Sequence, residues 1–262
     1  MMRALFTGAS GMRGQQFKID VTANNLANAN TVAFKNDRPE FVDLLYQQMR
    51  RPGGTSATGI QWPTSLQLGL GVNPAATAKN FTQGNYQATD QPLDMIIEGD
   101  GFFQVQAVDG STVYTRDGSF KMDAEGNVVT NEGLYLIPNI TIPENTEQIT
   151  ISVDGTVFAK LPGQVEDTEL GQITLVRFVN PQGLEALGIN VYGETGASGA
   201  PLEDVPGQNG LGTIRQGYLE MSNVSVVDEL VSLIVGQRAY EANSRSVQTS
   251  DEMLQTAVNL KR

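Results

Sequence analysis

Apolar positions near the start of the chain recur every seven residues, the spacing of one face of a long helix. Leu5, Met12, Ile19 and Leu26 fall on one line, with Ala9 and Ala23 at intervening seam positions and Gln16 as the polar exception. The pattern ends in the stretch VTANNLANANTVAFK, which has four asparagines within seven residues. Because asparagine amides compete for backbone groups, this run predicts the end of the helix.

The last part of the chain carries a similar repeat. Its four-three spacing predicts a helix from Val226 to Arg262, and Ser225 followed by Asp228 is a capping-box pattern at the start. At 1.5 Å per residue such a helix is about 55 Å long, which exceeds the diameter of a compact domain of this size. Two interpretations stay open: the terminal helices pair within one chain, or they pack against neighbouring subunits. The apolar positions are Val226, Leu230, Leu233, Tyr240, Val247, Leu254 and Val258.

The middle of the chain has a different pattern. From about residue 80 to 195, short β-branched and aromatic runs alternate with turn signals, including Asp-Gly pairs that begin at positions 100, 109, 117 and 154. This predicts an all-β domain built from hairpins. The flanks, 35–79 and 196–222, are rich in Gly, Pro, Ser and Thr and are expected to be extended connections. With helical ends at 1–34 and 223–262, the predicted fold class is α+β.

One stretch of the first connection stands out, YQQMRRPGGTSATGIQWP at 46–63, because it holds the only tryptophan. Its polar, turn-rich composition is typical of a mobile surface loop. Large apolar side chains, however, are costly to leave in water and are common at interfaces. We therefore expect a loop that a neighbouring subunit orders. Its candidate contact residues are Tyr46, Met49, Pro52, Ile60, Trp62 and Pro63.

Composition then narrows the possible functions. The chain has no cysteine and no histidine, which removes the commonest nucleophiles, general bases and metal ligands. Asp90 and Asp94 lack a nearby base, and the MDAEGNV turn lacks the bidentate glutamate of a calcium loop. No catalytic, metal or cofactor-binding residue and no cofactor is therefore expected. A net charge of −12 argues against nucleic acid and anionic membranes as partners.

The start of the chain bears on targeting. Its first residues have no apolar run long enough for a signal-peptide core, and no stretch of eighteen apolar residues occurs anywhere. We therefore expect neither membrane insertion nor a cleaved export signal.

Motifs at both ends and in the middle resemble one family. ANNLANANTVAFK, GDGFFQV, YTRDGSF and SNVSVVDELVSLIVGQRAYEANSRSVQTSDEML are similar to segments of the axial proteins of the bacterial flagellum, the rod and hook family, and the likeness covers essentially all 262 residues. Within that family, the chain length and the 46–63 segment resemble the members that build the straight distal part of the rod.

The resemblance implies a structural subunit, not an enzyme, that polymerises into a rigid hollow tube. The tube would transmit motor torque to the hook and let later subunits pass through it. The family places both terminal helices in an inner tube with coiled-coil-like packing and the β domain outside. Expected partners are copies of the chain itself, proximal rod and hook-family proteins, basal-body ring proteins and the flagellar type III export apparatus. The expected location is the basal body, spanning the periplasm toward the outer membrane.

The resemblance also suggests roles for three sets of residues. The 46–63 segment would lie between subunits and stiffen the tube. Asparagines would close the inner helix and turn the chain outward, namely Asn24, Asn25, Asn28 and Asn30. An inter-subunit helix seam would contain Leu5, Met12, Ile19, Leu26, Leu230, Leu233, Tyr240, Val247, Leu254 and Val258. The alternatives are another axial protein, of proximal rod or hook-like type, and a soluble β binding module with a helical stalk.

Overall fold

The computed structural model describes residues 2–50, 52, 64–163 and 167–259. The chain has helices at its two ends and a β-rich middle, so the α+β prediction is confirmed. It divides into two compact units. The helical unit comprises Met1–Ala27, Asp37–Ala78 and Ser225–Arg262, and the β unit comprises Asn28–Asn36 and Lys79–Val224.

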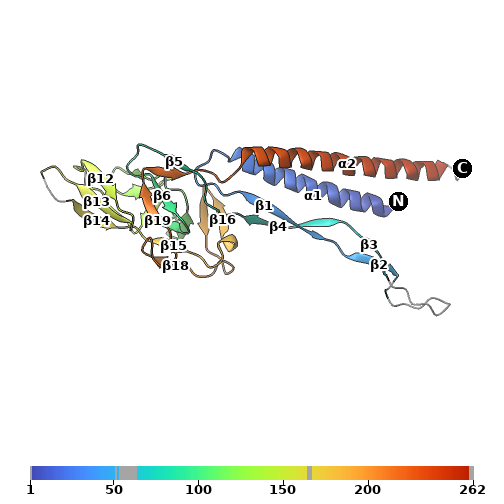
Figure 1. Ribbon diagram of the computed structural model, residues 1–262, viewed down its shortest axis with the longest axis horizontal. Coiled ribbons are helices and arrows are strands. Elements are labelled where there is room, and N and C mark those ends of the chain that lie inside the picture. Colours follow the sequence, from blue (N-terminus) through green and yellow to red (C-terminus); the bar gives the residue numbers. More distant parts are fainter. Residues whose placement is uncertain (1, 51, 53–63, 164–166, 260–262) are drawn as a thin grey trace. The chain divides into compact units, whose positions relative to one another are not determined.

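The helical unit contains two long helices, α1 (Met2–Ala27) and α2 (Val226–Asn259), which lie side by side in Figure 1. α2 begins where the capping pattern predicts, with Asp228 and Glu229 in its first turn, where carboxylates favour the helix dipole. Its 34 residues extend about 51 Å. The ends of α1 and α2 that carry the chain termini lie at the same end of the pair (Figure 1).

The helical unit also contains two-stranded ribbons. Strand β1 pairs with β4, and β2 pairs with β3 in antiparallel register. A region expected to be an extended connection therefore has regular backbone hydrogen bonding. An edge-to-face contact between the rings of Phe17 and Phe41, with centroids 6.5 Å apart, holds β1 against α1. The strands are β1 (Asp37–Asp43), β2 (Tyr46–Arg50), β3 (Leu66–Gly69) and β4 (Val72–Lys79).

The β unit is organised around a nine-stranded sheet with the order β16-β17-β8-β7-β11-β10-β9. Off this path, β15 pairs with β7, and β18 pairs with β15. Its strands are β7 (Phe102–Gln106), β8 (Thr112–Thr115), β9 (Lys121–Met122), β10 (Val128–Val129), β11 (Tyr135–Ile137), β15 (Leu175–Arg177), β16 (Glu185–Gly188), β17 (Val191–Gly193) and β18 (Leu202–Asp204). A 3₁₀ turn, η1 (Pro181–Gly183), precedes β16.

Three smaller sheets complete the β unit, with the pairings β12-β13-β14, β19-β6 and β20-β5. Phe103, Val105 and Leu136 are fully buried in its main apolar core, so this unit has a conventional hydrophobic interior. The strands of the smaller sheets are β5 (Tyr86–Ala88), β6 (Met95–Glu98), β12 (Gln148–Ile151), β13 (Thr156–Lys160), β14 (Thr168–Gln172), β19 (Thr213–Gln216) and β20 (Tyr218–Glu220).

Two sequence expectations differ from this arrangement. Segment 196–222 was expected to be an extended connection, but it supplies β18, β19 and β20, which pair with strands far away in the sequence. The Asp-Gly pairs at 109 and 154 do form hairpin turns. Those at 100 and 117 do not, because β6 pairs with β19 and not with β7, and β9 pairs with β10 and not with β8. Gly118 serves a different purpose: a Cβ there would lie 1.6 Å from the Met95 carbonyl oxygen.

Candidate assembly surface

The two helices pack in antiparallel directions through glycines. Gly8 of α1 faces Val247 of α2, and Gly236 of α2 faces Ile19 of α1. A Cβ added at Gly8 would lie 2.7 Å from Val247 Cγ2, and one at Gly236 would lie 3.1 Å from Ile19 Cγ1. The missing side chains therefore allow the two backbones to approach closely.

The residues that this pair buries are small or polar. Within the described part of the helices, the buried residues are Gly8, Gly14, Thr22, Asn25, Gly236 and Ser250. Burying such residues removes little apolar surface from water. Among its described residues, the helical unit consequently has no buried apolar interior like that of the β unit.

Large apolar side chains of α2 remain exposed. Val231 and Ile234, for example, are 55% and 56% exposed. Helical spacing places them on one stripe, which we call the α2 apolar face and which consists of Val227, Leu230, Val231, Ile234 and Val235. A contiguous exposed apolar stripe of this kind marks an interaction surface.

The predicted seam residues fall into three groups. Ile19 and Val247 lie against glycines of the opposite helix. Others are half-buried, namely Leu5, Met12, Leu26, Leu233 and Leu254. The remainder are exposed, namely Leu230, Tyr240 and Val258. Some of the predicted seam residues therefore pack within the chain, and others lie on a surface that is exposed in the single chain.

The asparagines likewise have separate roles. Asn24 and Asn25 lie inside α1, which ends at Ala27, so they do not form the turn expected of them. Asn25 is buried: its Nδ2 donates to the Asp37 carbonyl oxygen (2.8 Å) and to Glu229 Oε1 (2.9 Å), and its Oδ1 accepts from the Asp37 N–H (2.9 Å). One amide thus joins α1, β1 and α2, because only a side chain with both a donor and an acceptor can satisfy the Asp37 backbone.

Asn28 and Asn30 do lie in the turns after α1, within the β unit. The Thr31 N–H donates to the Asn28 carbonyl oxygen (3.1 Å), and Thr31 Oγ1 donates to Asn28 Oδ1 (3.1 Å). Asn28 therefore stabilises a local turn just beyond the helix.

The segment predicted to stiffen the tube begins as a strand and not as a loop. Tyr46 pairs with Gly69 in the β2–β3 ribbon, and its Cε1 lies 3.4 Å from the position of a Cβ at Gly69, so the ring covers a glycine that has no side chain to pack. Tyr46 and Met49 are both more than half exposed. Pro52 is described as part of a turn, whereas Ile60, Trp62 and Pro63 lie outside the described residues.

A buried charge cluster lies where the chain enters and leaves the β unit. Lys35 and Glu220 are 0% and 1% exposed, and Lys35 Nζ donates to Glu220 Oε1 (2.5 Å) and to the Thr82 carbonyl oxygen (2.8 Å). Glu220 Oε1 also accepts from the Gly84 N–H (2.9 Å), and Arg116 Nε lies 3.8 Å from Glu220 Oε2. Burial lowers the pKa of Lys35, and the Glu220 carboxylate opposes that shift.

Sequence reasoning missed Gly8, Gly236 and the Lys35–Glu220 pair. The spacing of Gly8, Gly11 and Gly14 at three-residue intervals was a usable sign of close helix packing. No comparable sign exists for Lys35 and Glu220, because 185 positions separate them in the sequence.

The described residues offer neither a metal site nor a membrane-spanning helix. In the part of the chain that the structure describes, no group of three or more acidic side chains is placed to hold a metal ion. No described helix is both long and apolar enough to cross a bilayer.

A pair of terminal helices with an exposed apolar face, attached to a well-packed β unit, defines a structural assembly protein. Family models agree with this class along the chain. Residues 5–35 match "Flagella basal body rod protein", residues 96–159 match "Flagellar hook protein FlgE/F/G D1 domain" and residues 215–260 match "Flagellar basal body rod FlgEFG protein C-terminal".

Curated relatives agree over the full length. The chain is 50% identical over 264 residues to the flagellar basal-body rod protein FlgG of Borreliella burgdorferi, covering 100% of both chains. It is 46% identical to the FlgG of Caulobacter vibrioides, covering 99% of this chain and 100% of that one. The flagellar hook protein FlgE of Helicobacter mustelae is 45% identical, but the match covers 51% of this chain and 30% of that one.

The chain belongs to the flagellar basal-body rod protein family, FlgG, and is a structural rod subunit and not an enzyme. A solved structure, the flagellar hook protein FlgE2 of Helicobacter pylori, aligns with a TM-score of 0.25 at 15% identity and covers 71% of this chain and 43% of that one. That similarity is too weak to carry an argument.

Proposed function

We propose that the chain polymerises through its terminal helices into the distal part of the flagellar rod. One observation carries this proposal: the helix pair buries only small and polar residues in its described part, while the α2 apolar face stays in contact with water. Copies of the chain would cover that face and supply the apolar burial that the single chain lacks. Such packing, with coiled-coil-like contacts between neighbours, would form the inner wall of a tube with the β units outside it.

The mechanical role follows from this packing. Torque passes along a tube whose stiffness depends on many contacts between subunits, and the ribbon that starts at β2 is our candidate for an added brace. Exposed Tyr46 and Met49 support that role, since apolar side chains of this size favour interfaces. The hollow interior would serve as the passage for exported chains.

Partners and location belong to the same proposal. Proximal rod and hook-family proteins would contact the two ends of the tube, and basal-body ring proteins would surround it. The chain would reach the periplasm through the flagellar type III export apparatus without signal cleavage. It would then lie in the basal body and extend toward the outer membrane.

The test compares sedimentation and electron microscopy of the purified full chain with those of a Val231→Asp, Ile234→Asp double variant. We expect straight tubes from the parent chain and soluble protein from the variant, because two carboxylates cannot be buried at the interface without a large desolvation cost. Gln248→Asp, at an exposed polar position about three turns beyond the α2 apolar face, serves as the charge control and should assemble normally. Tubes from the double variant at the parental concentration would refute the role of the α2 apolar face.

A second experiment concerns the brace. Deletion of residues 46–63 should give curved or more flexible tubes, measured as persistence length in electron micrographs. Tubes of unchanged stiffness would show that the segment has no bracing role.

A further inference from the structure

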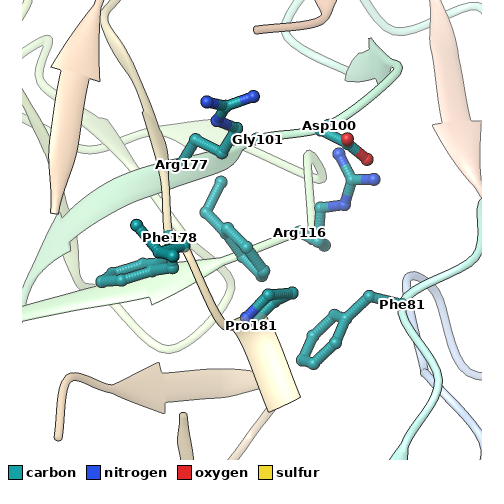
Figure 2. A pocket seen from close by; sticks show the side chains of 9 residues that line it. Phe81, Asp100, Gly101, Arg116, Arg177, Phe178 and Pro181 are labelled. Carbon is teal, nitrogen blue, oxygen red and sulfur yellow. The ribbon is translucent and has the colours of Figure 1, made fainter. Parts of the chain in front are cut away.

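The β unit contains a pocket of about 340 Å³ that the proposed helix packing does not use. Phe81, Phe102 and Phe178 form its apolar wall together with Pro181, and the ring centroids of Phe81 and Phe102 lie 5.4 Å apart in an edge-to-face contact. Figure 2 shows Phe81, Phe178 and Pro181 around one space, with the polar groups of Asp100, Arg116 and Arg177 in the upper half of the view. The volume is in the range of about 300 to 1,000 Å³ that is typical of ligand pockets.

The lining of the pocket holds two arginines, Arg116 and Arg177, and one carboxylate, Asp100, on a chain whose formal net charge is −12. Glu220 Oε2 lies 3.8 Å from Arg116 Nε and offsets part of that charge, so Arg177 supplies the positive charge at the edge of the pocket. Arg116 is buried, and its Nη1 has no hydrogen-bond partner, while its Nη2 donates to the Gly99 carbonyl oxygen (2.8 Å). This combination fits an occupant that carries an apolar group next to a carboxylate.

The chain itself presents such a group at the turn between β7 and β8. Val108, at 95% exposed, has a higher exposed fraction than any other large apolar side chain described. The next residue, Asp109, accepts hydrogen bonds from the Ser111 N–H (2.9 Å) and the Ser111 hydroxyl (2.6 Å), which lower the pKa of its carboxyl. The turn is therefore a preordered tip with an apolar side chain and an ionised carboxylate, and its docking costs little conformational entropy.

A similar Val-Asp-Gly turn at 153–155 is less accessible for docking into a pocket. A Cβ at Gly155 would lie 2.5 Å from the Ile173 carbonyl oxygen, whereas one at Gly110 would meet nothing within 4 Å. The turn at 108–110 is thus the one with open space around it.

We propose that the Val108–Asp109 turn of one copy docks into the Phe81–Phe102–Phe178 pocket of a second copy. Val108 would contact the aromatic wall, and Asp109 would pair with Arg177 at the edge of the pocket. β7 runs from the pocket at Phe102 toward the turn over five residues, about 16 Å, so tip and pocket lie at opposite ends of one hairpin. Because tip and pocket are different surfaces, the contact is head-to-tail and can repeat along a polymer. It adds a contact between β units to the assembly proposed above but does not depend on the α2 apolar face.

The test uses the absence of native cysteine. In the full chain, Val108→Cys and Val179→Cys place one thiol on the tip and one on a pocket residue that is 80% exposed. Mild oxidation followed by non-reducing electrophoresis should give a ladder of dimers, trimers and longer chains, since a disulfide needs Cα atoms within about 7 Å. Each single variant should give dimers at most. The control pair, Val153→Cys with Val179→Cys, should give no ladder.

The outcomes separate this proposal from the helix-packing proposal. A ladder specific to the 108–179 pair supports the docking, whether or not the protein sediments. Tubes that sediment without such a ladder overturn the docking and leave helix packing intact. The docking is also overturned if neither the sedimented nor the soluble protein gives a ladder. Equal ladders from the 108–179 pair and the 153–179 control pair overturn it as well.

A charge variant tests the polar half of the contact. In the 108–179 cysteine background, Asp109→Lys should slow cross-linking at least about fivefold, because a like charge then meets Arg177. The matched change Asp154→Lys, at another exposed turn aspartate, should leave the rate unchanged. Equal rates for both variants would refute the pairing of Asp109 with the pocket arginines.

Discussion

The two units of this chain differ in what they bury. The β unit places large apolar residues such as Phe103, Leu136 and Leu175 in a closed core. The helical unit buries glycines, hydroxyl side chains and Asn25 in its described helices, and it exposes the valines, leucine and isoleucine of the α2 apolar face. One chain thus combines a unit that buries its large apolar side chains within the chain and a unit that leaves an apolar helix face exposed.

This difference shows how a single sequence can encode both folding and assembly. A core that closes within the chain gives stability at any concentration, whereas an exposed apolar helix face gives stability that depends on the concentration of neighbours. The following changes separate the two, from the largest expected effect to the smallest.

Removal of the buried carboxylate should destabilise the β unit most. Glu220→Ala leaves Lys35 and Arg116 without their shared negative partner, and breaking a buried pair costs about 3–5 kcal/mol. Hydrogen exchange of the β7 amides should accelerate accordingly. Glu98→Ala, which removes the partner of a more exposed pair with Arg215, is the control and should cost less than about 1 kcal/mol. Equal exchange in both variants would contradict the role of the cluster.

Truncation of one side chain in each unit tests the comparison directly. Phe103→Ala should lower the free energy of unfolding of the β unit by about 3–4 kcal/mol, because it opens a cavity in a closed core. Ile234→Ala should change the free energy of monomer unfolding by less than about 0.5 kcal/mol, because Ile234 is 56% exposed in the single chain. Denaturant unfolding below the assembly concentration measures both. Similar losses would mean that the helical unit has a core of its own.

Loss of the Asn25 amide tests whether polar contacts hold the helical unit. Asn25→Ala removes both hydrogen bonds to the Asp37 backbone and the one to Glu229, and it should cost about 2 kcal/mol, seen as a lower midpoint of helix unfolding by circular dichroism. Gln16→Ala, at an exposed position of α1, should leave that midpoint unchanged. The bridging role of Asn25 fails if the two variants melt alike.

The smallest effect concerns Asp117 in the β unit. Burial raises the pKa of its carboxyl, with a further contribution from nearby Asp94, against hydrogen bonds from Ser119. Since the folded state then holds this proton more tightly than the unfolded state, the contribution of Asp117 is greatest below its ordinary pKa. That contribution is lost as the pH rises through the raised pKa.

Asp117→Asn should therefore raise the free energy of unfolding at pH 7, by less than about 1 kcal/mol, while retaining an acceptor for Ser119. The gain should shrink as the pH falls toward 4. A gain that grows on acidification would reverse the assigned direction.

The sequence by itself determined the elements whose signals are local. Heptad spacing located both helices, the capping pattern at Ser225 fixed the start of α2, and Asp-Gly pairs at 109 and 154 marked real hairpins. It also excluded thiol and imidazole chemistry, because composition needs no geometry.

Only the tertiary structure decided which surfaces meet. Periodicity gives a face but not its partner: Leu230 and Leu233 are equivalent in the repeat, whereas in the structure Leu233 is half-buried and Leu230 is exposed. Lys35 and Glu220 could not be paired in advance, and β18–β20 looked like a connection, because their partners lie far away in the sequence. Long-range pairing depends on the complete chain path, and that path is a property of the whole fold and not of any short stretch of residues.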